Sequence, residues 1–282
     1  MGTMNVLAAG AAYLSDLGGD WRYVPGDTPL SRFSTAVTAV LGYFIVIRVL
    51  QSVMEYRKPM KVMGLLIAHN AFLCIVSAIL FAWLGVALVY NSPYRRMSAK
   101  NTLDYMICSS ELHDNGSLQL IYWFNYLLKY YELLDTVFLV LRKKPVIFLH
   151  EYHHGATILL TWSQQNEHST AQWVPILYNL GVHVAMYYYY VLSALKIHVP
   201  WKKHLTTVQI MQFIVGVSSS SYAYYRYLFT PEKCHGNDTG AIVGVSVLFS
   251  YFILFMRFYY RTYGLKKKTS GTKPMELKAN AN

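Results

Sequence analysis

Residues 63–90 read MGLLIAHNAFLCIVSAILFAWLGVALVY, and no Asp, Glu, Lys or Arg interrupts them. A helix that crosses a bilayer needs about 20 mostly apolar residues, so this stretch predicts a membrane-spanning helix. Similar apolar runs between polar clusters predict further spans on both sides of it. They lie at residues 33–53, 118–141, 146–164, 171–195, 206–229 and 241–261. We therefore expect an all-α membrane protein with seven transmembrane helices.

The composition of the 282-residue chain agrees with this expectation. Hydrophobic residues make up 54% of the chain and charged residues only 14%, against about 25% charged residues in ordinary soluble domains. So few charges argue against a disordered chain and against a coiled coil. No stretch interleaves basic and aromatic residues as nucleic-acid-binding segments do, so we expect no nucleic-acid partner.

The basic residues predict the orientation of the spans. Most of them fall in one alternating set of loops and in the C-terminal tail, which places these segments in the cytosol. The net charge of +11 is therefore mainly a topology signal. The predicted division is a luminal N-terminal segment at 1–32, a transmembrane domain at 33–261 and a basic cytosolic tail at 262–282.

The third predicted span contains three charged residues, Lys129, Glu132 and Asp135, at every third position of one helix face. A charge at the centre of a spanning helix costs roughly 2.5–3.5 kcal/mol on insertion scales, so these residues are functional candidates. We expect Lys129 and Asp135 each to pair with Glu132. A purely structural buried salt bridge is the alternative.

The fourth predicted span begins with a histidine cluster. His150, His153 and His154 occupy positions i, i+3 and i+4, so three imidazoles can converge on one helix face. A single histidine in a span is more often an ordinary core residue, whereas three together favour a functional site. The cluster lies on the predicted cytosolic side.

The fifth and sixth predicted spans also carry polar stripes at helical spacing. The residues are Asn179, His183, Met186, Tyr187 and Tyr190 in the fifth span, and Thr206, Gln209 and Gln212 in the sixth. Packing and ordinary hydrogen bonds between helices are the alternative explanation for each stripe. Because four successive spans direct polar groups inward at similar depth, we interpret them as the lining of one pocket open to the cytosol.

Four motifs in this order and spacing resemble those of the ELO family of very-long-chain fatty acid elongases. The motifs are Lys129-x-x-Glu132-x-x-Asp135-Thr136, His150-x-x-His153-His154, Asn179-x-x-x-His183-x-x-Met186-Tyr187 and Thr206-x-x-Gln209-x-x-Gln212. The stretch 144–190 looks most like the fungal-type members. The resemblance implies seven helices, six of which surround a narrow acyl-binding tunnel, in the endoplasmic reticulum membrane.

The activity implied by this resemblance is that of a 3-oxoacyl-CoA synthase, an acyltransferase of fatty acid elongation. It would join malonyl-CoA to a long-chain acyl-CoA, release CO2 and CoA, and extend the chain by two carbons. No cofactor or metal is expected in this chain. The reductase, dehydratase and enoyl reductase of the elongation cycle are the implied partners, and a homodimer is left open.

The mechanism that we infer is a ping-pong reaction in which His153 takes the acyl group, because no cysteine lies where it could act as the nucleophile. The other predicted catalytic residues are His150, His154, His183, Asn179, Asp135 and Glu132. The predicted substrate-binding residues are Lys129, Thr136, Met186, Tyr187, Tyr190, Gln209 and Gln212. The cytosolic basic residues Arg142, Lys143, Lys144, Lys202 and Lys203 are candidates for attracting CoA phosphates, or simply for anchoring the spans.

Two features depart from the family pattern. The chain ends Ala279-Asn280-Ala281-Asn282, whereas many members end in a dilysine retrieval signal. Pro145 stands five residues before the histidine cluster, where members that act on polyunsaturated chains often carry Gln. The second departure favours saturated or monounsaturated substrates, with a polyunsaturated-chain elongase as the alternative.

The predicted luminal loops contain Cys108 and Cys234, which we expect to form a disulfide in an oxidising compartment. Asn237 begins a glycosylation sequon in the second of these loops.

Two other functions compete with the elongase. A membrane di-iron desaturase or hydroxylase also uses an HxxHH cluster, but it needs further histidine clusters, and the remaining histidines here are scattered. A seven-span transporter or receptor could also use a polar pocket, although the sequence contains no internal repeat.

Overall fold

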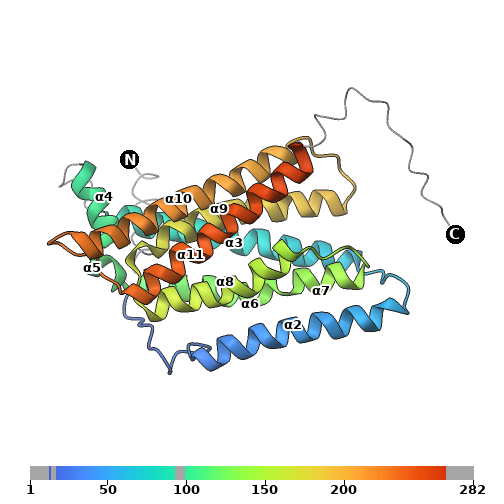
Figure 1. The fold of residues 1–282 in the computed structure, drawn as a ribbon, viewed down its shortest axis with the longest axis horizontal. Coiled ribbons are helices and arrows are strands. Elements are labelled where there is room, and N and C mark those ends of the chain that lie inside the picture. The colour runs from blue at the N-terminus through green and yellow to red at the C-terminus, as the bar shows by residue number, and fades with distance from the viewer. Residues whose placement is uncertain (1–12, 14–16, 93–98, 265–282) are drawn as a thin grey trace.

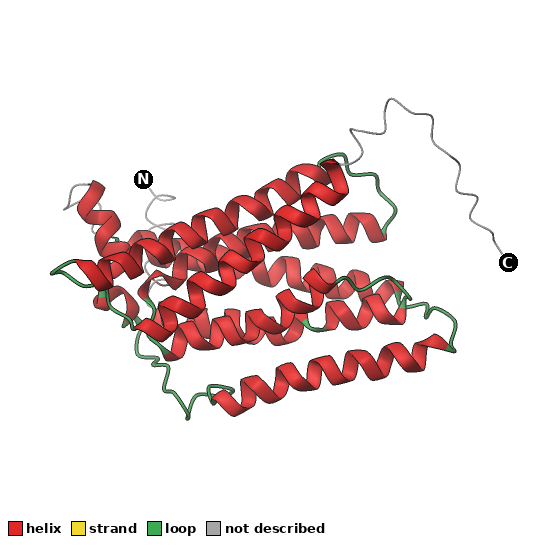
Figure 2. Ribbon diagram, in the orientation of Figure 1, coloured by secondary structure: helices red, strands yellow, loops and turns green. Residues whose placement is uncertain are grey.

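In the computed structural model, the chain is described at residue 13 and at residues 17–92 and 99–264, where every regular element is helical (Figure 2). Within these ranges three helical stretches are long and apolar enough to cross a membrane, namely Phe33–Glu55, Met63–Asn91 and Asp238–Gly264. These stretches mark the chain as a membrane protein. Most of the predicted basic tail, from residue 265, and the beginning of the N-terminal segment lie outside the described residues.

The long helices coincide with the apolar runs of the sequence. Those on the N-terminal side are α2 (Phe33–Glu55), α3 (Met63–Asn91), α6 (Gly116–Glu132), α7 (Leu134–Leu141) and α8 (Phe148–Asn166). Those on the C-terminal side are α9 (Trp173–Ala194), α10 (Lys202–Phe229) and α11 (Asp238–Tyr259), which continues into the π-helix η2 (Tyr260–Gly264). The short elements are α4 (Ala99–Cys108), α5 (Ser110–His113) and the 3-10 turn η1 (Thr170–Gln172).

The predicted span 118–141 is divided into α6 and α7 at Leu133, so the expectation of one continuous helix is wrong at this point. The Leu133 amide donates to the Tyr130 carbonyl, and the Thr136 amide donates to the Leu133 carbonyl. Both bonds join residues three apart, as in a 3-10 turn, which winds more tightly than an α-helix. The break therefore changes the direction in which Asp135 points relative to Glu132.

The helices form a bundle in which α3 packs along α9 and α10 packs along α11. Helix α8 contacts α2, α6 and α11, and α2 lies on the outer side of the bundle beside α7 and α8 (Figure 1). The largest apolar cluster joins α3, α6 and α9 through buried residues such as Leu84, Ile121 and Leu180. These contacts hold together the helices that carry the predicted site.

The bundle has two ends, which we name by what they contain. The histidine end comprises the connections 56–62, 142–147 and 195–201 and the parts of the adjoining helices that carry the predicted charged and histidine residues. The disulfide end comprises α4, α5, η1 and the connection 230–237, and Figure 1 shows α4 and α5 together at that end. Asn115 and Asn237 cap α6 and α11 there by accepting bonds from the Leu118 and Gly240 amides.

Candidate active site

A cavity of about 360 Å³ lies toward the histidine end, among α3, α7, α8, α9, α10 and α11. Side chains from all four predicted motifs line it, which brings together residues that are far apart in the sequence. The predicted residues on its wall are Asp135, Arg142, His150, His153, His154, Asn179, His183, Met186, Tyr187, Tyr190, Gln209 and Gln212. The polar stripes of α8, α9 and α10 therefore face one space.

Four polar side chains beside this cavity form a closed ring of contacts. Lys129 Nζ donates to Glu132 Oε1 at 2.9 Å and to Asn179 Oδ1 at 2.8 Å. Asn179 Nδ2 lies 3.1 Å from His183 Nε2, and His183 Nδ1 lies 3.2 Å from Glu132 Oε1. Lys129 and Glu132 are almost fully buried, so each charge depends on the other and on the two neutral side chains.

The ring fixes how its neutral members are oriented. A lysine ammonium only donates, so the Asn179 atom facing Lys129 is its carbonyl oxygen and the Asn179 amide group faces His183. His183 Nε2 therefore accepts a hydrogen bond from the Asn179 amide group, and Nδ1 is the ring nitrogen that faces Glu132. The pairing of Lys129 with Glu132 is the one that the sequence predicts.

Asp135 belongs to a second network. His69 Nε2 on α3 lies 2.7 Å from Asp135 Oδ1, and the Tyr187 hydroxyl donates to Asp135 Oδ2 at 2.8 Å. His154 Nε2 lies 3.8 Å from the same Oδ2. The expected pairing of Asp135 with Glu132 is wrong, because the turn at Leu133 directs Asp135 toward α3 and α9, where it has donors instead of a second carboxylate.

His150 is held by Thr136 on α7. Thr136 Oγ1 lies 3.0 Å from His150 Nε2 and 2.9 Å from the Tyr43 hydroxyl, so a chain of three groups connects α2, α7 and α8. The His150 and His154 rings are 4.4 Å apart between centroids. These contacts place His150 and His154 on the same part of the cavity wall.

His153 differs from its two neighbours because it has aromatic surroundings. Its ring centroid lies 4.6 Å from that of Tyr251, and Phe213 and Phe255 pack at its edges. Its Nδ1 atom is buried and has no hydrogen-bond partner among the residues that the structure describes. His153 also lines a deeper cavity of about 60 Å³, so it stands where the two spaces meet. Its imidazole therefore faces both cavities, and no carboxylate is bonded to it among the described residues.

The predicted phosphate-binding residues divide into two groups. Arg142 lines the large cavity. The other four, Lys143, Lys144, Lys202 and Lys203, are exposed around the same end of the bundle. Lys143 Nζ donates to the Glu55 carbonyl, which ties it to the end of α2.

Sequence reasoning missed four residues of this region: His69, Asn70, Tyr43 and Arg48. His69 and Asn70 are buried on α3, and Asn70 lines the cavity. Arg48 makes two hydrogen bonds to the Glu151 carboxylate, which points away from the three histidines. The residues three and four positions from His69 are all apolar, so no polar stripe drew attention to it. Its neighbour Asn70 is polar but adjacent in sequence, which is not the spacing of one helix face. Contact with Asp135, which is 66 residues away, is what identifies His69.

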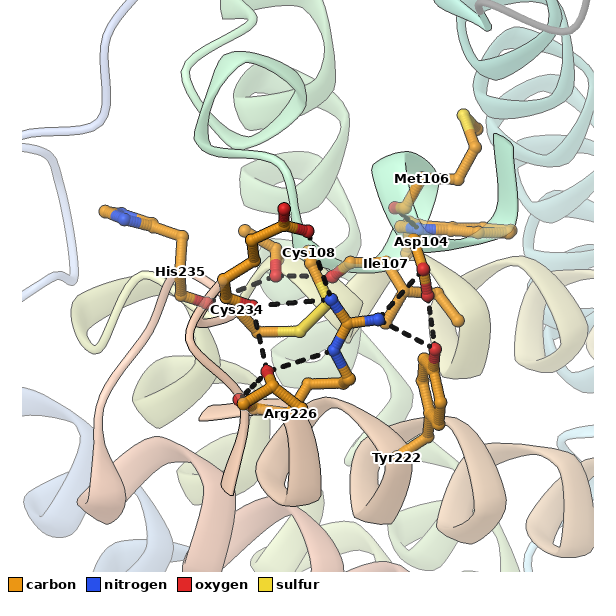
Figure 3. Close-up of a disulfide and its surroundings, with 12 residues drawn as sticks. Asp104, Met106, Ile107, Cys108, Tyr222, Arg226, Cys234 and His235 are labelled. Atoms are coloured by element: carbon orange, nitrogen blue, oxygen red, sulfur yellow. Dashed lines mark hydrogen bonds and ion pairs between the residues drawn. A yellow bond between two sulfur atoms is a disulfide. The ribbon is translucent and has the colours of Figure 1, made fainter. Parts of the chain in front are cut away.

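The disulfide end uses its polar residues differently. Cys108 and Cys234 are joined by a disulfide there, beside an ion pair in which Arg226 Nη1 lies 2.9 Å from Asp104 Oδ2 (Figure 3). Asn237 donates through its amide nitrogen to Glu167, so the atom that a glycan would use already has a structural partner.

Two titratable groups at the disulfide end are shifted by burial. Burial raises the pKa of Tyr23 to about 12, although its hydroxyl accepts a hydrogen bond from Asn166. Burial lowers the pKa of His113, whose ring packs in a group with those of His168 and His235. Both effects arise from the loss of water around the charged form.

No group of three or more His, Cys, Asp or Glu side chains within the described ranges is arranged to hold a metal ion. The imidazoles of the histidine cluster contact Asp135 and Thr136 instead. The di-iron alternative therefore gains no support from the arrangement of these side chains.

Comparisons with known proteins agree with the motifs. The sequence model of the ELO family, described as the GNS1/SUR4 family, matches residues 28–271. A Schizosaccharomyces pombe protein, to which the name fatty acid elongase 1 is assigned by inference, is 40% identical over 259 residues. The alignment covers 88% of this chain and 75% of the relative. Fatty acid elongase A of Dictyostelium discoideum is 36% identical, over 86% of this chain and 89% of its own. Fatty acid elongase sre1 of the same organism is 35% identical with the same coverage. With the motifs now assembled around one cavity, we conclude that the chain belongs to the ELO (GNS1/SUR4) family.

Proposed function

We propose that this protein is the condensing enzyme of fatty acid elongation, a 3-oxoacyl-CoA synthase. In this reaction an acyl-CoA, malonyl-CoA and a proton give a 3-oxoacyl-CoA two carbons longer, together with CO2 and CoA. The observation that carries the proposal is the large cavity, which His150, His153, His154 and Asp135 line together. Among them His153 has a ring nitrogen, Nδ1, without a hydrogen-bond partner among the described residues. The family's relatives, which are named fatty acid elongases, support the same conclusion.

The first half-reaction would be acyl transfer to His153. An imidazole nitrogen attacks the thioester carbonyl, the carbon–sulfur bond breaks, and the departing thiolate takes the proton that the imidazole loses. The product is an acyl-histidine and free CoA. A histidine without a charged partner suits this role, because its Nδ1 atom is not hydrogen-bonded to another side chain among the described residues.

The second half-reaction would form the carbon–carbon bond. Malonyl-CoA loses CO2, the resulting enolate attacks the acyl carbonyl, and the bond to His153 breaks as the imidazole regains a proton. A hydrogen-bond donor aimed at the enolate oxygen in a site without water is worth roughly 3 kcal/mol. His150 and His154 are the nearest candidate donors, since both His183 nitrogens face Asn179 and Glu132.

The two networks would set the protonation states of these histidines. Asp135 orients His154 and is itself held by His69 and Tyr187. The Lys129–Glu132–His183–Asn179 ring holds the inner wall of the cavity in one arrangement. Arg142 at the cavity and the lysines around the histidine end would attract the CoA phosphates.

The membrane arrangement that we propose has seven spans in the endoplasmic reticulum, with the disulfide end and the N-terminus in the lumen and the histidine end in the cytosol. The excess of basic residues at the histidine end supports this orientation, as does a disulfide at the opposite end. The acyl chain would then extend from the large cavity into the deeper one. Saturated or monounsaturated chains are the favoured substrates because of Pro145.

The chain carries out one step of a four-step cycle in this proposal. A 3-oxoacyl-CoA reductase, a 3-hydroxyacyl-CoA dehydratase and an enoyl-CoA reductase would complete the cycle as partners. The condensation itself needs no cofactor, because decarboxylation of malonyl-CoA supplies the electron pair that forms the new bond.

The test is a condensation assay with the full chain in microsomes, given labelled malonyl-CoA and a panel of saturated, monounsaturated and polyunsaturated acyl-CoAs without NADPH. We expect labelled 3-oxo products two carbons longer than the acyl-CoA supplied. His153→Ala should abolish them, whereas His198→Ala, which alters an exposed histidine outside the cavity, should not. Retention of most activity by folded His153→Ala would overturn the assignment of His153 as the nucleophile. Absence of product from every acyl-CoA would overturn the proposed condensing function.

A further inference from the structure

The deeper cavity is where an acyl chain attached to His153 would extend. It lies among α6, α8, α9, α10 and α11, and its lining runs from His153 to Gln165 and Gln172 near the disulfide end. Gln165 follows His153 by twelve residues on α8, which is about 18 Å along the helix axis. The cavity is therefore long and narrow, and parts of its wall are apolar, such as Leu160, Ile176 and Leu248.

Several amide groups interrupt this apolar wall. The side-chain carbonyl oxygens of Asn125, Gln165 and Gln212 are buried, and none has a hydrogen-bond partner among the described residues. Each of these residues lines the cavity and is at most 7% exposed. Three unpaired amide acceptors around one space are unusual, since the great majority of buried polar groups in proteins are hydrogen-bonded.

Several other polar residues of the wall are hydrogen-bonded within the protein. The Thr157 and Thr161 hydroxyls donate to the carbonyls of His153 and Thr157, one turn earlier on α8. Gln164 donates to the Gly240 carbonyl on α11. The three amide oxygens and His153 Nδ1 are thus the buried side-chain atoms of this wall without a partner among the described residues, and an occupant of the cavity could supply one.

Two of the three amides lie at the same depth. Asn125 precedes Asp135 by ten residues on the α6–α7 segment, about 15 Å toward the disulfide end. Gln165 follows His154 by eleven residues on α8, about 16 Å in the same direction. Asp135 Oδ2 and His154 Nε2 lie 3.8 Å apart, so the two starting points are at about the same level of the bundle. Asn125 and Gln165 are therefore at about equal depth. Gln212 also lines the large cavity and lies closer to His153.

A plain alkyl chain cannot satisfy these acceptors, because it offers only C–H groups. We propose that the deep cavity selects acyl chains that carry a hydroxyl group in their distal part, which donates to Asn125 Oδ1 or Gln165 Oε1. An extended chain advances about 1.25 Å per carbon, given carbon–carbon bonds about 1.5 Å long. Gln165 lies about 18 Å along α8 from His153, where the chain would be attached, so the hydroxyl would stand roughly 14 or more carbons from the thioester.

This inference rests on the proposed condensing function and names the substrate class within it. The hydroxyl takes no part in the reaction and leaves with the product unchanged. Ordered water is the other occupant that could satisfy the amides, and it would place no requirement on the chain.

The test compares three substrates of equal chain length in the same microsomes: palmitoyl-CoA, 16-hydroxypalmitoyl-CoA and 2-hydroxypalmitoyl-CoA. We expect kcat/KM for the 16-hydroxy chain to exceed that for palmitoyl-CoA by about tenfold, which is the effect of one net hydrogen bond. The 2-hydroxy chain should show no such advantage, because its hydroxyl would lie beside His153. Equal use of palmitoyl-CoA and the 16-hydroxy chain would overturn the proposal in favour of water.

Variants locate the preference in the cavity. Gln165→Leu and Asn125→Leu should remove the advantage of the 16-hydroxy chain and leave palmitoyl-CoA as the better substrate. Ser77→Ala is the matched control, since the Ser77 hydroxyl is also buried without a partner among the described residues but lines neither cavity. Unchanged selectivity in both leucine variants would overturn the proposal. Absence of product from every chain, palmitoyl-CoA included, would instead refute the condensing function on which it rests.

Discussion

The two ends of the bundle solve the same problem, the placement of polar groups in a mainly apolar molecule, in opposite ways. At the histidine end, side chains bond to one another, as Lys129 does with Glu132 and Asp135 does with His69. At the disulfide end, side-chain pairs such as Arg226 with Asp104 are joined by backbone caps and a cross-link, as with the Asn115 cap and the Cys108–Cys234 disulfide. Side-chain networks can enclose a cavity and exchange protons, whereas caps and cross-links only hold helices in place. The difference predicts that variants at the histidine end change activity, with or without a change in stability, whereas variants that loosen the disulfide end change stability alone.

The largest effect is expected when the buried charges of the histidine end are separated. Glu132→Gln would leave the Lys129 ammonium without its carboxylate, and removal of one partner of a buried pair costs about 3–5 kcal/mol. Glu55→Gln, at an exposed position, is the control. Thermal unfolding of the purified protein and the condensation assay would measure the two effects together.

The double variant Lys129→Met with Glu132→Met sharpens this prediction. Replacement of both charges by apolar side chains of similar volume is often close to neutral for stability. We expect its melting temperature to return toward that of the parent while activity remains lost, because the ring around Asn179 and His183 is gone. Recovery of activity along with stability would show that the ring serves the fold alone.

The positions of the helices could be predicted from the sequence to a large extent, because apolar runs of spanning length have few alternatives. The polar stripes on α8, α9 and α10 were also predicted to face one space, since helical spacing alone defines a face. The direction of Asp135 could not be predicted. It depends on the turn at Leu133, and the sequence around Leu133 contains no Gly or Pro that would signal a break.

The second prediction concerns the cross-link of the disulfide end. Cys108→Ser should lower the free energy of unfolding by about 2–4 kcal/mol, because the disulfide closes a loop across 126 residues of sequence. Activity measured well below the melting temperature should stay close to that of the parent, since the large cavity with the histidine cluster lies at the other end. The measurement is the melting temperature of the parent with and without reductant, together with the condensation rate.

Cys74→Ser serves as the control, because Cys74 is the free cysteine of the described residues. Its reductant-dependent shift in melting temperature should equal that of the parent, whereas Cys108→Ser should show no shift. A reductant that leaves the parent unchanged would contradict a stabilising role for the disulfide.

The third prediction tests whether the histidine end depends on residues outside the sequence motifs. His69→Ala would release Asp135 Oδ1, and misplacement of a group at a reacting centre by about 1 Å can cost up to 10²-fold in rate. We expect kcat to fall about 10- to 100-fold with little change in KM for the acyl-CoA. His69→Gln should recover part of the loss, because its amide can also donate to Asp135.

His204→Ala, which removes an exposed histidine of α10, is the matched control. Equal losses in His69→Ala and His69→Gln would mean that the ring packing with Tyr131 and Phe138, rather than the hydrogen bond, is what matters. His69 illustrates why such residues escape sequence reasoning: a contact across 66 residues leaves no local pattern.

The smallest effect is a pH dependence at the disulfide end, centred on His113. Its pKa is lowered chiefly by burial, with Asp114 acting in the opposite direction and His168 and His235 lowering it further. The unfolded chain therefore binds a proton at this position more readily than the folded chain, from the ordinary value of 6.5 downward. Stability that is present above about pH 6.5 should be lost as the pH falls below it.

The measurement is the melting temperature of the parent and of His113→Gln at pH 7.5 and pH 5.5, with exposed His198→Gln as the control. The parent should lose more stability than His113→Gln over this interval, whereas His198→Gln should follow the parent. If the melting temperatures of the parent and of His113→Gln fell equally between pH 7.5 and pH 5.5, the burial of His113 would not contribute to the pH dependence of stability. The condensation rate at permissive temperature should not distinguish His113→Gln from the parent at either pH, because protonation at this end alters how firmly the helices are held and leaves the networks around Asp135 and Glu132 in place.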